Sequence, residues 1–143
     1  MERSGNSICR TPKTPQRIEK KKRINTSSAK AKGRSLQQWV CQKISDLLGL
    51  PWGKDEMIAS REMGQSGVDI RLIGEAKKQF PYSVECKYQE SWSIPAWIHQ
   101  AKTNQEKNMN WLLVIRKNRF DPIVVMDANH FFDLLLRLKE WDK

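Results

Sequence analysis

Long hydrophobic runs are missing from this chain of 143 residues. No stretch of about eighteen consecutive apolar residues occurs, so no membrane-spanning helix is expected. The first residues lack the apolar centre of a secretory signal, which favours an intracellular, cytoplasmic protein. Cysteine is scarce as well. Cys9, Cys41 and Cys86 are widely spaced, so they predict neither a zinc site of paired cysteines nor a disulfide framework.

Acidic residues are rare at the start of the chain. Residues 1–34 hold eleven Lys and Arg against Glu2 and Glu19, whereas the other 109 residues hold fifteen against fourteen. Because residues 1–31 also have few large apolar side chains, we predict a disordered basic arm there and one folded domain over 32–143. Such an arm favours binding to nucleic acid, because contacts with phosphates release counterions.

Two other roles for the arm are weighed against nucleic-acid binding. An anionic membrane surface also attracts cations, but the arm lacks the apolar spacing of an amphipathic helix. The run Lys20-Lys21-Lys22-Arg23 is compatible with a nuclear address as well as with a phosphate contact. Nucleic acid is therefore the favoured partner, and no membrane partner is expected.

Periodicity predicts the first half of the folded domain. Apolar residues from Leu36 to Leu48 recur at helical spacing, with Ser35 as a suitable cap and Gly49 at the end. Strands are expected at 57–61, 68–73 and 82–88. The charged connector 74–81 contains Pro81 and suggests a hairpin loop, which would make the second and third strands antiparallel.

The second half alternates between helices and strands. Ser93 is placed to cap a helix with Pro95 in its first turn, and that helix fades near Asn108. Apolar runs over 111–115 and 122–126 predict two buried strands, and Asp127 is placed to cap a last helix. The order α-β-β-β-α-β-β-α predicts a mixed α/β fold: a mixed central sheet flanked by helices in three layers.

Two carboxylates and a lysine form the candidate site. Glu85 and Lys87 are two apart on one predicted strand and so share a face. Asp69 lies on the preceding strand, just after Gly64 and Gly67, where a backbone can approach a ligand closely. If these strands pair, the three side chains converge, and two carboxylates with a lysine suit a divalent metal such as Mg²⁺ and phosphodiester hydrolysis. Taken singly, each is also compatible with a solvated surface charge.

A family resemblance rests on these residues. Gly67-Val68-Asp69, a spacer of fifteen residues and then Glu85-Cys86-Lys87 resemble the core motif of the PD-(D/E)xK nucleases, with Val68 in place of the usual proline. Within that superfamily, residues 32–126 resemble the archaeal-type Holliday junction resolvases and their phage relatives. The added matches are Lys32-Gly33-Arg34, Arg61, Gly64, Ser66, Gly67 and Gln100-Ala101.

The resemblance implies a restriction-endonuclease-like core and particular roles within it. Asp69 and Glu85 would bind Mg²⁺ or Mn²⁺, with the Cys86 carbonyl assisting, and Lys87 would be the catalytic lysine. Ser66 would approach the scissile phosphate, and Gln100 would steady the lysine or the substrate. Relatives carry a glutamate at the position of Gln37, and an uncharged amide there leaves a second metal site unsupported.

Further polar and aromatic residues are candidates for contact with DNA. Trp52 and Trp92 lie near the expected edges of the site and could stack on bases, whereas the spacing of Trp97 favours the core. His99 and His130 have no partners at ligand spacing and are interpreted as structural or exposed. The candidate phosphate contacts are Lys32, Arg34, Arg61, Lys78 and Lys102.

The favoured function is a metal-dependent endonuclease for branched DNA, with a Holliday junction resolvase as the first choice. Two symmetric cuts in a four-way junction would require a homodimer. A different nuclease with the same core, such as a repair nuclease, a flap nuclease or a site-specific one, is the alternative within enzymes. Outside enzymes, the alternatives are a non-catalytic nucleic-acid-binding protein and an RNA-packaging or ribosomal protein. A phage origin is compatible with the resemblance.

Overall fold

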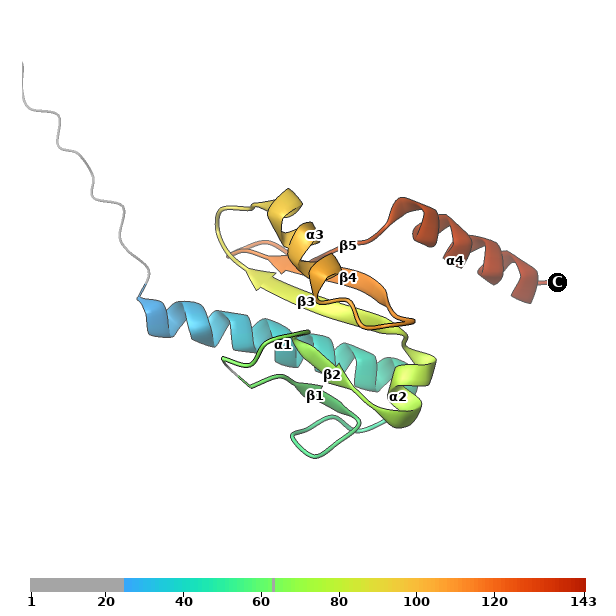
Figure 1. Ribbon diagram of the computed structural model, residues 1–143, viewed down its shortest axis with the longest axis horizontal. Coiled ribbons are helices and arrows are strands. Elements are labelled where there is room, and N and C mark those ends of the chain that lie inside the picture. Colours follow the sequence, from blue (N-terminus) through green and yellow to red (C-terminus); the bar gives the residue numbers. More distant parts are fainter. Residues whose placement is uncertain (1–24, 63) are drawn as a thin grey trace, which may run out of the picture.

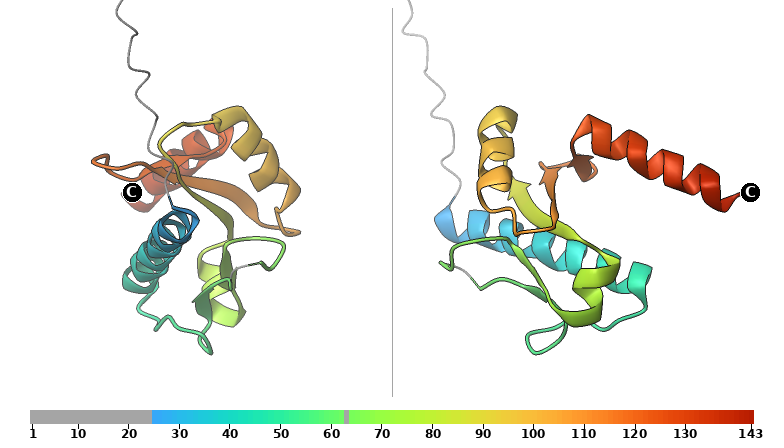
Figure 2. Two further views of the ribbon diagram at one scale, coloured as in Figure 1. Left: turned by 90° about the vertical axis from the view of Figure 1, so that its left-hand side faces the viewer. Right: turned by 45° about the vertical axis from the view of Figure 1, so that its right-hand side comes forward.

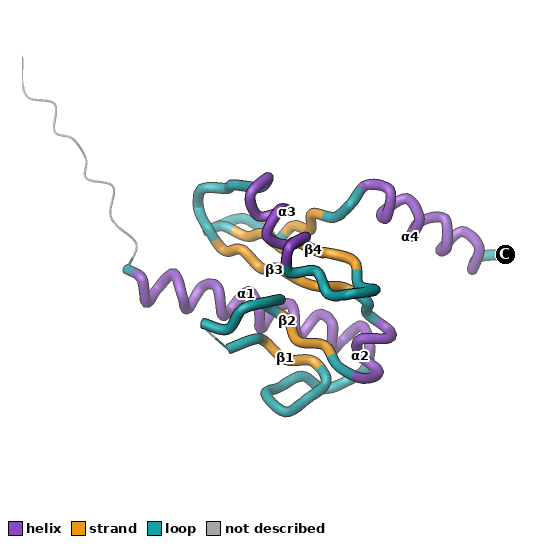
Figure 3. Tube along the Cα trace, viewed as in Figure 1, coloured by secondary structure: helices purple, strands orange, loops and turns teal. Residues whose placement is uncertain are grey.

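The computed structural model describes residues 25–62 and 64–143 and has the mixed α/β fold expected from the sequence (Figure 1). Nine elements follow one another along these ranges (Figure 3). Most of the predicted arm, residues 1–24, lies outside the described residues. The elements are α1 (Thr26–Leu48), β1 (Ile58–Ser60), β2 (Ile70–Leu72), α2 (Gly74–Gln79), β3 (Tyr82–Tyr88), α3 (Ile94–Thr103), β4 (Asn110–Arg116), β5 (Ile123–Val125) and α4 (Ala128–Trp141).

The predicted sheet is divided into two small sheets. β1 and β2 pair antiparallel, while β3 pairs parallel with β4, and β4 pairs antiparallel with β5. Parallel β3 and β4 need a crossover, and α3 supplies it. The larger sheet therefore has β4 at its centre, and β3 is its edge toward β1 and β2.

Helices cover both faces of the larger sheet, which confirms the three layers. On one face, α1 packs Leu36, Val40 and Ile44 in a cluster with Val84 of β3 and Val114 of β4. On the other face, α3 packs Trp97 and Ala101 against buried residues of β4. Trp97 is thus a core residue, as its spacing predicted. Figure 2 shows α1 and α3 on opposite sides of the strands.

The first helix begins ten residues earlier than predicted. Its cap is Asn25, whose side-chain oxygen accepts from the Ser27 N–H, and not Ser35. Within the described part of the predicted disordered arm, residues 26–31 are therefore helical, which corrects that expectation. Ala29 and Ala31 are strong helix formers, so the helix extends into a segment that has no apolar face. Its end was correctly predicted: Gly49 has φ 67° and its N–H donates to the Ser45 carbonyl.

The predicted hairpin between the second and third strands was wrong. Residues 74–79 form α2, and β2 pairs with β1 instead of β3. The connector could fold into a helix because Gly74 adopts φ 57° at its start and Ala76 is fully buried. A backbone hydrogen bond from the Asp69 N–H to the Val84 carbonyl, 3.0 Å long, joins the loop before β2 to β3.

The last helix projects from the body of the protein (Figures 1 and 2). Asp127 caps it as predicted, its carboxylate accepting from the His130 N–H at 3.1 Å. None of its residues is buried, although its apolar residues recur at helical spacing. Within the described ranges, no helix is both long and apolar enough to cross a membrane.

Candidate active site

Strand β3 sorts its side chains between two environments. Val84 and Cys86 point to the face covered by α1, where both are buried in the main cluster. Glu85 and Lys87 point to the opposite face, toward α3. The alternation predicted from the sequence is therefore confirmed, and it brings a carboxylate and an ammonium to the same side of an edge strand.

Lys87 is held by two oxygen acceptors. Its Nζ lies 2.9 Å from Glu85 Oε1 and 2.9 Å from Gln100 Oε1 of α3. The side chains of Lys87 and Glu85 are only 17% and 4% exposed, so this ion pair is largely shielded from water. These two contacts hold the Lys87 ammonium in one position at the sheet edge, whereas a surface lysine rotates freely.

Asp69 reaches the same strand from the loop before β2. Its Oδ2 accepts from the Cys86 N–H at 2.7 Å. Burial, first, and the nearby Glu85 carboxylate, second, raise the pKa of Asp69 from 3.8 to about 6, while the Cys86 N–H, Lys87 and Arg61 oppose the rise. A cation bound between the two carboxylates would relieve the repulsion that Glu85 exerts on Asp69.

The oxygen donors at this edge suit a hard divalent cation. Within one strand residue the N–H and C=O point to the same edge, so the Cys86 carbonyl lies on the side where its N–H meets Asp69. Burial raises the pKa of the Cys86 thiol well above its ordinary value, which leaves the carbonyl and not the sulfur as the available donor. In the described part of the chain no three His, Cys, Asp or Glu side chains gather. Two carboxylates are nevertheless enough for Mg²⁺, which keeps several waters.

Asn104 is a member of the cluster that the sequence analysis missed. Its Nδ2 lies 3.5 Å from Glu85 Oε2, so the two oxygens of Glu85 face Lys87 and Asn104 respectively. Asn104 ends α3, four residues after Gln100. This i, i+4 spacing places both amides over β3 and is the signal that could have identified it.

A cleft of about 360 Å³ adjoins the Asp69 loop between α1 and β1. Arg34 and Gln37 of α1 line it together with Ser60, Arg61 and Glu62. The Arg61 N–H donates to the Asp69 carbonyl at 2.7 Å, which ties the cleft to the carboxylates. The structure thus brings Arg34, Gln37 and Arg61 together.

The loop that contains Ser66 is held by Arg61. The Arg61 guanidinium donates to the Ser66 carbonyl, and Gly67 has φ 102° with the guanidinium 3.0–3.3 Å from where a Cβ would stand. A side chain at this position would both strain the backbone and collide with Arg61. Ser66 itself is exposed on this loop, before Asp69.

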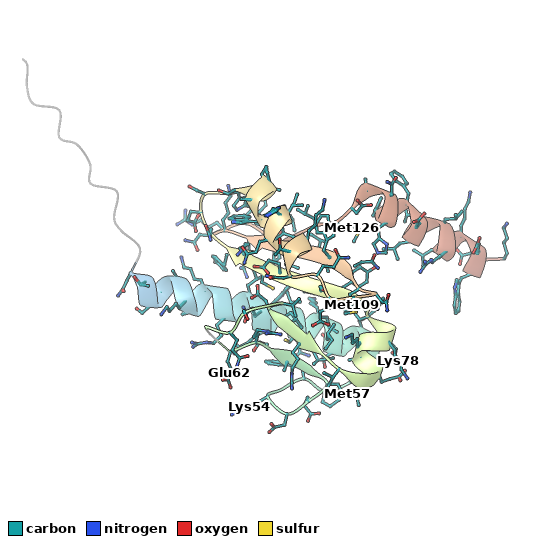
Figure 4. All side chains as sticks on the ribbon, in the orientation of Figure 1. Lys54, Met57, Glu62, Lys78, Met109 and Met126 are labelled. Carbon is teal, nitrogen blue, oxygen red and sulfur yellow. The ribbon has the colours of Figure 1, made fainter. Side chains whose placement is uncertain are left out.

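The other predicted DNA contacts are dispersed. Lys102 stacks over Trp111, 5.7 Å from the ring centre, and lines a different cleft with His130. Lys32 lies over Tyr88 at the end of β3. Lys78 is on α2, at the far end of the small sheet from Glu62 (Figure 4).

The predicted aromatic and histidine residues also lie apart from one another. Trp52 is half-buried and its indole N–H donates to Gln42 Oε1 at 2.8 Å. The indole N–H of Trp92 donates to the Gln89 carbonyl. His99 is exposed on α3, whereas His130 Nε2 lies 2.6 Å from the Tyr82 hydroxyl and links α4 to β3.

Comparison with known proteins assigns this arrangement to a family. The model of the family described as "Phage putative PDDEXK endonuclease" matches residues 28–141. No curated protein and no solved structure matches the chain. The matched region extends beyond residues 32–126, to which the sequence resemblance was confined, and includes α4. The family description indicates a nuclease of the PD-(D/E)xK superfamily, a group that generally uses divalent metals and acts on DNA.

Proposed function

We propose, from the premise that this chain belongs to the phage PDDEXK endonuclease family, that it is a metal-dependent endonuclease that cuts branched DNA. The proposal depends on one observation: Asp69 bonds to the backbone of β3 next to the ion pair of Glu85 and Lys87. A four-way junction is the favoured substrate, and the enzyme would act as a homodimer in the host cytoplasm.

Asp69, Glu85 and the Cys86 carbonyl would hold the cation, Mg²⁺ or Mn²⁺. When bound, such an ion neutralises negative charge on the phosphate oxygens and makes the phosphorus more open to attack. The protein supplies the remaining functions. Lys87 is placed to hold a water molecule or to stabilise charge that develops on phosphate, because an ammonium is a compact hydrogen-bond donor.

The neighbours of these residues act by positioning. Gln100 accepts from Lys87 and Asn104 contacts Glu85, so each fixes the orientation of one reacting group. Ser66, on the loop held by Arg61, is proposed to approach the scissile phosphate. Arg34 and Arg61, which share the adjoining cleft, are proposed to contact the flanking phosphates, with Lys32 and Lys102 farther along the strand ends.

Branched DNA is favoured over a specific sequence by what the described residues offer. The cleft beside the site is lined by side chains from α1, from the end of β1 and from the loop after it, and its two arginines suit contacts with phosphates. Binding would then depend on phosphate positions and on the shape of the junction.

The direct test compares three labelled substrates. A four-way junction, a flap and a linear duplex are incubated with full-length protein in Mg²⁺ and in EDTA. Paired symmetric cuts in the junction that disappear in EDTA and in Glu85→Gln are expected. Glu75→Gln, which neutralises an exposed glutamate on α2, is the matched control and should cut like the native chain.

Each other outcome identifies a competing function. Equal cutting of all three substrates would indicate a different nuclease of the same family. Tight binding without cutting in any divalent metal would indicate a non-catalytic DNA-binding protein, and preferential binding of RNA would indicate the packaging alternative.

A further inference from the structure

The last helix exposes an apolar surface that nothing in the described structure covers. On α4, Phe131, Phe132, Leu135, Leu136 and Leu138 are between 45% and 66% exposed. At 100° per residue they occupy one broad face, which Lys139 shares near the end of the helix, while Asn129, Asp133 and Glu140 lie outside it. We call these five residues the α4 apolar face. Contiguous exposed apolar surface of this kind marks an interaction site.

The face cannot be covered by the body of the same chain, because α4 contacts the body through its other side. The His130 ring bonds to the Tyr82 hydroxyl. Burial raises the pKa of Tyr82, and the positive charge of Arg137 partly opposes this rise. His130 and Arg137 both lie outside the α4 apolar face. A fourteen-residue helix that buries nothing is marginal in water, since most helical stability in proteins comes from packing. We therefore expect a cover from outside the described part of the chain.

Charge narrows the identity of this cover. Residues 128–143 hold three acidic and three basic side chains, so the helix has no net charge. Nucleic acid is disfavoured because its binding needs an excess of cations. An anionic membrane is disfavoured for the same reason, because interfacial helices are rich in Lys and Arg. Residues 1–24, with eight Lys and Arg, are too polar to bury an apolar face.

The charges at the two ends of the helix suit a second copy of α4. In an antiparallel pair, the end 137–143 of one copy, where three cations outnumber Glu140 and Asp142 by one, lies at the end of the other copy that holds Asp127 and Asp133. In a parallel pair, each lysine would instead lie beside the same lysine of the second chain, and the two like charges would repel. Opposite charges across an interface favour the first arrangement and disfavour the second. Antiparallel pairing about a two-fold axis is also the commonest symmetry of homodimers.

We infer that the α4 apolar face is the homodimer interface of this protein, with two α4 helices packed antiparallel around Leu135. The pairing would leave both β3 edges free and would fix two active sites in one particle. Only the need for two sites rests on the proposed function. The exposed face and its charges do not.

Sedimentation of full-length protein without DNA tests the interface separately from the activity. The native chain should sediment as a dimer, and Leu135→Lys should shift the midpoint of dissociation by at least about tenfold in concentration. Asp133→Asn, which changes the net charge by the same +1 on the opposite side of α4, should leave the midpoint unchanged. Because Leu135 is exposed in the single chain, both variants should keep the native melting temperature at protein concentrations where the native chain is also monomeric.

A crosslinking measurement tests the antiparallel register. With Cys9 replaced by serine, Leu135→Cys should form a disulfide between copies at least about tenfold faster than Asn129→Cys, because only residue 135 would meet its own copy. A native chain that stays monomeric at all concentrations would overturn the inference, and so would a dimer unaffected by Leu135→Lys. A monomer that binds anionic vesicles through α4 would overturn it in favour of a membrane. Loss of cutting with an intact dimer would count against the proposed function alone.

Discussion

Among individual side chains, Asp69 is a carboxyl group whose ionised form is destabilised by burial in the folded protein. Its pKa of about 6 means that the folded chain keeps a proton which the unfolded chain releases near 3.8. The native state therefore binds more protons between these values, and the free energy of unfolding falls as pH rises through this window. Above it the penalty is constant, and at most about 3 kcal/mol at about 1.4 kcal/mol per pH unit.

The first prediction follows from this penalty. In EDTA, Asp69→Asn should gain stability relative to the native chain as pH rises from 4 to 6, because only the native chain must ionise residue 69, and it should be the more stable protein at pH 7. Scanning calorimetry across pH measures both. Asp46→Asn, at an exposed carboxylate on α1, is the control and should keep the native profile. A difference in stability between Asp69→Asn and the native chain that does not grow through the window would contradict the assigned environment.

A second residue-scale prediction concerns the amide that holds the lysine. Gln100→Ala removes an acceptor from Lys87, so its single-turnover cutting rate should fall about tenfold while the affinity for DNA stays within about twofold. Gln100→Glu keeps an acceptor at this position and should lose less. His99→Ala, the exposed neighbour, should match the native rate. Equal losses in rate and affinity would instead make Gln100 a substrate contact.

At the scale of elements, two glycines of α1 make opposite predictions. Gly49 ends the helix at φ 67°, a conformation that costs an L-residue about 1 kcal/mol, so Gly49→Ala should destabilise the protein by about that amount. Gly33 lies within the helix, and an added Cβ would meet nothing within 4 Å. Gly33→Ala should therefore stabilise it by about 0.5–1 kcal/mol. Urea unfolding measures both, and equal effects would contradict the helix boundaries.

The sequence predicted those elements whose apolar pattern is set by burial. β3 was predicted with its correct bounds because Val84 and Cys86 alternate with Ser83 and Glu85, and the two faces of an edge strand meet different layers. The end of α1 was predicted because Gly49 has a local conformational reason to be there. In both cases the signal lies within a few adjacent residues.

Other elements were missed because their cause lies elsewhere in the chain. The start of α1 depends on the Asn25 cap and on helix-forming residues without an apolar face, so periodicity could not detect it. The charged segment 74–79 becomes a helix around one buried residue, Ala76, and this removes the predicted hairpin. Asp69 still reaches β3, but through a loop that bonds to Cys86 and Val84 rather than through a paired strand. Asn104 was missed because its role depends on where α3 ends.

At the scale of the whole molecule, charge and fold are separated along the chain. Residues 1–24 carry eight Lys and Arg against two glutamates, and they lie outside the described structure. If this segment binds DNA through phosphates, the logarithm of the binding constant should fall linearly with the logarithm of the salt concentration. Each phosphate that the segment neutralises should add about 0.9 to the steepness of this line. The folded part should bind with a much shallower slope.

Deleting residues 1–24 should therefore weaken junction binding at low salt and flatten the salt dependence by several units. Fluorescence anisotropy in EDTA, where no cutting occurs, measures the slope. A full-length variant with the eight Lys and Arg replaced by glutamine controls for chain length and should behave like the deletion. If the slope of either variant equals that of the native chain, the phosphate contacts lie in the folded part instead.

The central claim is that the carboxylates of Asp69 and Glu85 share one divalent cation at the edge of β3. Anomalous diffraction from crystals soaked in Mn²⁺ tests it most directly, because Mn²⁺ substitutes for Mg²⁺ among oxygen ligands. We predict one peak between these two carboxylates in the native protein and none there in Asp69→Asn. A native crystal without that peak, grown from protein that cuts DNA in Mn²⁺, would contradict the account.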